Sequence, residues 1–76
     1  MNKEKFIVRI DQYWPDYFEN FVHHCNDIAE KNDWNVRTVM NYELKPYGRW
    51  IPTRTQGSYL RWDEAKYHTA FVLRWS

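Results

Sequence analysis

Glu19, His23 and Asp27 have the clearest ligand-like spacing in the sequence, because they fall four residues apart. Residues at i, i+4 and i+8 of a helix share one face, and carboxylates together with an imidazole are ligands that a divalent metal accepts. The same spacing is typical of an ordinary solvated helix surface, and we interpret these three residues in that way. The sequence therefore predicts no metal site and no cofactor.

Two other combinations of residues could support catalysis. Cys25, the only cysteine, could act as a nucleophile with His68 as its base, and Glu43 with His68 could form a general acid–base pair. Cys25 lies among apolar residues at helical spacing, however, where a thiol is a buried and unreactive hydrophobic group. We therefore predict that the protein is not an enzyme. A small toxin-type ribonuclease is the least favoured alternative.

Aromatic residues and arginines are interleaved in the second half of the chain. Aromatic residues make up 20% of the 76 residues, and a domain of this size buries only about 60% of the surface that its unfolded chain exposes. Several rings should therefore remain exposed. Tyr, Trp and Arg dominate binding hot spots because each combines a large contact area with a polar group. The predicted partner-binding residues are Tyr47, Arg49, Trp50, Arg54, Tyr59 and Arg61.

The elements that would position these residues follow from hydrophobic periodicity. Apolar residues between Phe18 and Ala29 recur every three or four positions after Pro15, which is typical of a helix start, and residues 34–45 alternate with the period of a strand. In chain order we expect a strand over 6–10, a helix over 15–33, a strand over 34–45, a turn over 46–49, a short edge strand or loop over 49–58, a strand over 58–62 and a strand over 67–75.

These elements predict one α+β domain over residues 1–76, with the order β-α-β-β-β. One helix would pack on one face of a mainly antiparallel sheet of four or five strands, which leaves the other face uncovered. That face would carry a second binding patch, formed by Arg9, Arg37, His68 and Arg74. A second copy of the chain, a protein target or a nucleic acid could cover it.

Charge favours a protein target over a nucleic acid. The net charge is only +1, with −3 on residues 1–33 and +4 on residues 34–76, so that one surface is basic without the bulk charge of a dedicated nucleic-acid binder. No apolar run is long enough to span a membrane, and the start of the chain lacks the features of a signal peptide. We therefore expect a cytoplasmic protein with no membrane association.

The predicted function is that of a non-enzymatic binding module acting on a protein surface, with nucleic-acid or nucleotide binding as the alternative. The combination of small size, many aromatic residues and no catalytic motif is similar to that of the accessory proteins with which phages block a host or defence enzyme, including anti-CRISPR proteins. This resemblance implies an inhibitor that acts by occupying its target. The uncovered sheet face predicts, separately, that the protein could form a homodimer.

Overall fold

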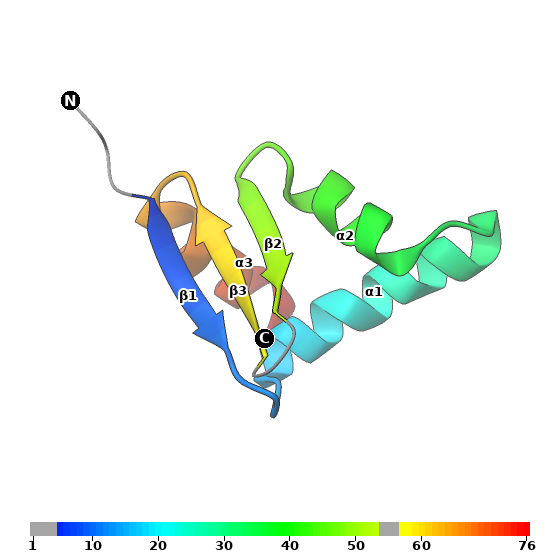
Figure 1. The fold of residues 1–76 in the computed structure, drawn as a ribbon, viewed down its shortest axis with the longest axis horizontal. Helices are drawn as coiled ribbons and strands as arrows, with labels where there is room; N and C mark the ends of the chain where they lie inside the picture. The colour runs from blue at the N-terminus through cyan, green and yellow to red at the C-terminus, as the bar shows by residue number, and fades with distance from the viewer. Residues whose placement is uncertain (1–4, 54–56) are drawn as a thin grey trace.

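The computed structural model describes residues 5–53 and 57–76. The helices and strands that it contains are, in chain order, β1 (Phe6–Ile10), α1 (Asp16–Asn32), α2 (Val36–Leu44), β2 (Gly48–Pro52), β3 (Ser58–Trp62) and α3 (Ala65–Trp75) (Figure 1). The α+β class is confirmed. The predicted order β-α-β-β-β and the predicted count of four or five strands are wrong, because the described residues form three strands and three helices.

The first strand and the first helix lie where the periodicity predicts them. The carbonyl of Pro15, in extended conformation, accepts hydrogen bonds from the amides of Phe18 (3.0 Å) and Glu19 (3.1 Å), which begins α1. Asp33 ends the helix in the left-handed region at φ 55°, and the amide of Trp34 donates to the carbonyl of Ala29 at 2.8 Å. Short polar side chains such as Asp tolerate this conformation better than other non-glycine residues do.

Residues 34–45, predicted as a strand, contain a helix instead. The side chain of Asn35 accepts a hydrogen bond from the amide of Arg37 at 2.8 Å, which satisfies one of the unpaired donors at the start of α2. Val39, Met40 and Leu44 are buried. The segment therefore carries apolar residues at the three- and four-residue spacing of a helix as well as at alternate positions, and packing against α1 selects the helix.

The C-terminal segment, predicted as a strand over 67–75, is also helical. Phe71 is buried, and Tyr67 and Trp75, four residues to either side of it, are partly buried against the same core. Residues at this spacing share one helix face. The segment therefore packs as α3 against β3 and α1 and does not add a strand to the sheet.

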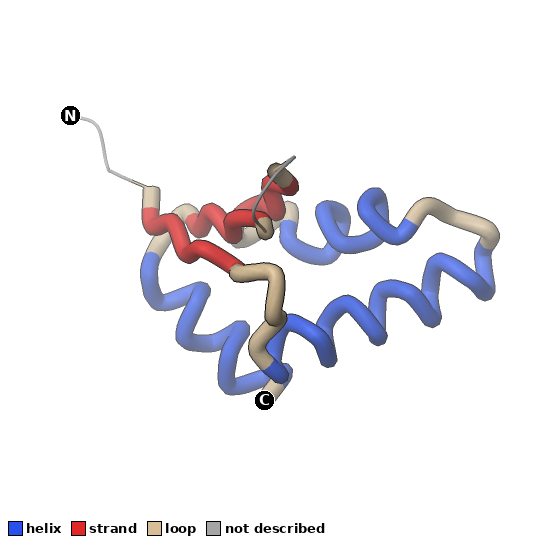
Figure 2. The backbone as a smooth tube through the Cα atoms, turned by 60° about the horizontal axis from the view of Figure 1, so that its bottom comes forward, coloured by secondary structure: helices blue, strands red, loops and turns tan. Residues whose placement is uncertain are grey.

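The sheet is antiparallel in the order β1-β3-β2, and the helices leave one of its faces uncovered (Figure 2). Two helices, α1 and α3, lie on one side, whereas α2 lies beside the edge strand β2. The side chain of Asn41 in α2 accepts a hydrogen bond from the amide of Trp50 at 3.1 Å, and Pro52 has no amide hydrogen. These two features limit the hydrogen bonds that this edge can offer to another strand.

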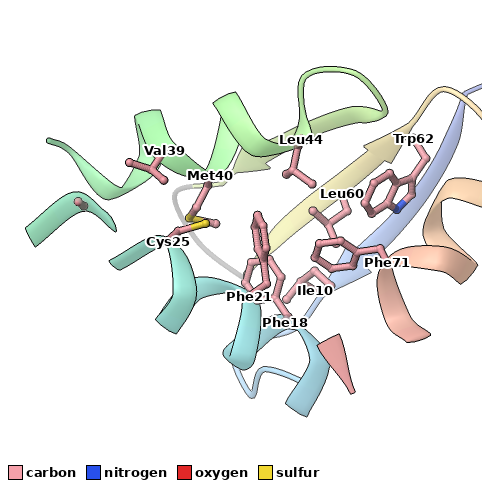
Figure 3. Packing of buried hydrophobic residues seen from close by; sticks show 11 residues of the cluster. Ile10, Phe18, Phe21, Cys25, Val39, Met40, Leu44, Leu60, Trp62 and Phe71 are labelled. Carbon is pink, nitrogen blue, oxygen red and sulfur yellow. The ribbon is translucent and has the colours of Figure 1, made fainter. Parts of the chain in front are cut away.

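The core lies between the inner face of the sheet and the three helices (Figure 3). Trp62 is the largest side chain in it, at 1% exposure, and Phe18 is 0% exposed. None of the helices in the described part of the chain combines the length and apolar character needed to cross a membrane. The buried apolar cluster consists of Ile10, Phe18, Phe21, Cys25, Ala29, Val39, Met40, Leu44, Leu60, Trp62 and Phe71.

Candidate functional site

The uncovered face of the sheet carries two rows of side chains. Each row runs across the three strands and consists of residues that are register partners. Successive strand residues point to opposite faces, so the residues between the buried positions of β1 and β3 point outward. In one row Arg61 lies opposite both Ile7 and Arg49, and in the other Tyr59 lies opposite both Arg9 and Ile51. We call this surface the outer sheet face; it consists of Ile7, Arg9, Arg49, Ile51, Tyr59 and Arg61.

The outer sheet face is positively charged. Three of its six residues are arginines and none is acidic. Arg49 and Arg61 are direct register partners, and like charges at such positions repel each other. The Nε atom of Arg61 is buried and has no hydrogen-bond partner among the described residues. One donor of this cross-strand pair is therefore without an acceptor in the described part of the chain, and an anion could offset the repulsion.

Exposed apolar side chains lie on the same face. Ile7 is 58% exposed and Ile51 is 37% exposed, while Tyr59 is half-buried between its neighbours. No described helix or strand covers them (Figure 2). A surface on which arginines and a tyrosine accompany exposed aliphatic groups has the composition of an interface.

Part of the predicted binding segment reaches this face. Arg49, Tyr59 and Arg61 lie on it, and Arg54 lies outside the described residues. Trp50, in contrast, is the register partner of buried Leu60, so its ring points to the inner face and packs against the core. The alternation within β2 could have shown this if the strand had been recognised.

Tyr47 is also placed away from the outer sheet face. It lies in the turn before β2, where its ring is 5.2 Å from that of Tyr67 in α3. Ile51, which sequence reasoning missed, occupies a place on the face. Its position one residue after Trp50 in a strand is the signal that could have identified it.

The predicted second patch is divided among three elements. Arg9 belongs to the outer sheet face. Arg37 lies on α2, with its guanidinium 5.8 Å from the centre of the Trp50 ring. His68 and Arg74 lie on α3, on the covered side of the sheet. The patch does not form because two of the strands from which it was inferred are helices.

Comparison of the chain with protein-family models, with curated proteins and with solved structures found no match.

The residues considered for metal binding and catalysis do not converge on one site. His23 lies 3.8 Å from Glu19, but no three His, Cys, Asp or Glu side chains in residues 5–53 and 57–76 gather around a point that could hold a metal ion. Burial, with a smaller contribution from the Glu43 carboxylate, raises the pKa of the Cys25 thiol to about 12. At neutral pH this thiol is therefore protonated and a poor nucleophile.

His68 is half-buried among aromatic rings. The centres of the Phe6, Tyr17 and Trp62 rings lie 5.9, 5.8 and 5.7 Å from that of His68, and burial lowers the pKa of its imidazole. Glu43, which could have formed an acid–base pair with it, lies 3.7 Å from His24. His68 therefore packs against these aromatic rings, and protonation of its imidazole should change the free energy of unfolding.

We expect the free energy of unfolding to decrease as the pH falls below 6.5, the ordinary pKa of a histidine. The unfolded chain then binds a proton at His68 before the folded chain does, which favours unfolding until the pH reaches the lower pKa of the folded state. Urea unfolding at about pH 7.5 and about pH 5.5 measures this change. In His68→Gln the decrease should be smaller. An unchanged pH dependence in that variant would contradict the prediction.

Proposed function

We propose that the protein is a non-enzymatic binding module whose outer sheet face docks on an acidic surface of a partner protein. The supporting observation is the composition of this face, in which three arginines and two exposed isoleucines lie around Tyr59. Complementary charge would steer the partner toward the arginines, and burial of the aliphatic groups would stabilise the complex. The module would act by covering part of its partner.

The same face favours a protein over a nucleic acid. Stacking of bases requires exposed aromatic rings, and Tyr59 is the only ring on the outer sheet face. Ile7 and Ile51, in contrast, are side chains that a protein interface buries. The net charge of +1 supports the same choice.

Substitutions on the outer sheet face test this function. Ile7→Asp places a negative charge among the arginines, and Leu73→Asp makes the same change on α3 at a residue that is 74% exposed. Proteins retained from a lysate by the immobilised wild-type chain would be purified and titrated against each variant. We expect Ile7→Asp to weaken binding about tenfold or more, and Leu73→Asp to have no effect.

Arg49→Glu separates binding from stability. The substitution converts the like-charge pair with Arg61 into a pair of opposite charges, which should raise the free energy of unfolding by about 0.2–1 kcal/mol. Binding of the purified partner should nevertheless weaken about tenfold. Loss of binding in a more stable protein cannot be attributed to unfolding.

Three results would overturn the proposed function. The first is equal affinity of the purified partner for the wild-type chain, Ile7→Asp and Arg49→Glu. The second is binding of duplex DNA or single-stranded RNA that depends on these residues and decreases steeply with salt. The third is a homodimer, detected by sedimentation, that Ile7→Asp dissociates.

A further inference from the structure

A groove between β2 and α2 continues the outer sheet face beyond the edge of the sheet. Its volume is about 460 Å³, and Gly48 and Asp63 contribute to its wall. The hydrogen bond from the Trp50 amide to Asn41 joins β2 to α2, so the two sides of the groove belong to elements that pack on each other. The groove is also lined by Thr38, Asn41, Tyr42, Lys45, Arg49 and Arg61.

Positive charge is concentrated in this groove. Lys45 at the end of α2 adds a third cation to Arg49 and Arg61, which face each other across the strands. The carboxylate that lines the groove, that of Asp63, lies 3.1 Å from the ammonium group of Lys5. This ion pair is exposed, and the groove is therefore lined by three cations and one carboxylate.

Donors that carry no charge lie beside the cations. Thr38 and Tyr42 bring hydroxyl groups to the groove. The oxygen of the Asn41 amide accepts the hydrogen bond from Trp50, which leaves the NH₂ group of the same amide to donate. This set of groups matches an anion with several oxygens.

We propose that the β2–α2 groove binds a phosphorylated side chain of the partner protein. A carboxylate offers one charge and two oxygens, whereas a phosphate monoester carries about 1.5 to 2 charges and three acceptor oxygens at neutral pH. Two facing arginines and a lysine can neutralise that charge, and a guanidinium binds phosphate oxygens through two parallel hydrogen bonds. The inference rests on the proposed function, because Arg49 and Arg61 belong to both surfaces.

Three synthetic peptides test the groove directly. They share one acidic sequence and carry serine, glutamate or phosphoserine at a single central position. In titrations followed by NMR, the phosphoserine peptide should bind about tenfold more tightly than either of the others. The signals of the Arg61 Nε–H group and of the Asn41 side-chain amide should shift as it binds.

Matched variants test whether the peptide binds in the groove. Lys45→Ala should weaken binding of the phosphoserine peptide about tenfold, since it removes a cation from the groove alone. Lys66→Ala, which removes an exposed lysine from α3, should have no effect. Adenosine monophosphate and a single-stranded oligonucleotide serve as the nucleic-acid probes.

The outcomes distinguish this inference from the function on which it rests. Equal affinity for the three peptides, or tighter binding of either nucleic-acid probe, overturns the phosphoryl site. If that happens while the purified partner still depends on Ile7, the inference alone fails. If the phosphoserine peptide binds but the purified partner has the same affinity for Ile7→Asp as for the wild-type chain, the proposed function fails and the groove remains a phosphoryl site.

Discussion

Trp62→Ala is expected to lower the free energy of unfolding by about 3 to 5 kcal/mol. The indole is 1% exposed and lies between the sheet and α3, with its ring centre 5.1 Å from that of Phe71. Its removal would leave a cavity where two layers of the structure meet. A 76-residue domain has a total stability of about 4 to 11 kcal/mol, so that the variant would lose a large fraction of it. Urea unfolding followed by circular dichroism measures the change.

Two further substitutions control this experiment. Trp34→Ala removes the same side chain at a position that is 60% exposed, and should change the free energy of unfolding by less than about 0.5 kcal/mol. Trp62→Phe retains a ring and removes an indole Nε1 that has no partner among the described residues, so its cost should be well below that of alanine. Equal effects of alanine at positions 34 and 62 would show that Trp62 is not a core residue.

Gly48→Ala is expected to destabilise the sheet and weaken partner binding together. A Cβ atom at this position would meet the backbone carbonyl oxygen of Arg61, and a backbone atom can move aside only if the strands separate. We expect a loss of about 1 to 3 kcal/mol or more in the free energy of unfolding. Since β2 carries Arg49, its displacement would also separate that arginine from Arg61. Thermal unfolding and titration with the purified partner measure the two effects.

Ile51→Ala provides the comparison for Gly48→Ala within the same strand. Its side chain is 37% exposed on the outer sheet face, and its removal creates no clash. We expect a small change in stability, together with weaker partner binding. Should Gly48→Ala prove as stable as the wild type, the close approach of β2 to β3 at this point would be disproved.

The predictions from sequence were correct where one periodicity stood alone. The strand over Phe6–Ile10 and the helix over Asp16–Asn32 show a single clear period, and in α1 the turn residues at both ends agree with it. In Val36–Leu44 and in Ala65–Trp75, apolar and aromatic residues are so frequent that both periods can be traced. Alternation predicts strands in both segments, whereas the capping residue Asn35 indicates a helix start in the first of them.

Only part of the candidate site follows from the sequence, and the reason is again that packing decides which elements form. Arg49, Tyr59 and Arg61 could be recognised by residue type, because the chemistry of these side chains does not depend on the fold. Their grouping with Arg9 depends on the strand order β1-β3-β2, which brings the N-terminal strand beside the third. Trp50 was included because its type suggested an anchor, whereas the register of β2 directs it inward.

The sequence by itself thus determined the α+β class, two of the three strands, the first helix and the types of residue available for binding. Only the tertiary structure decided that two further segments are helices, and that arginines from three separate strands share one uncovered face. The physical reason is that local periodicity specifies which residues can be buried together. Which element they form, and which face remains open, depends on the partners against which they pack.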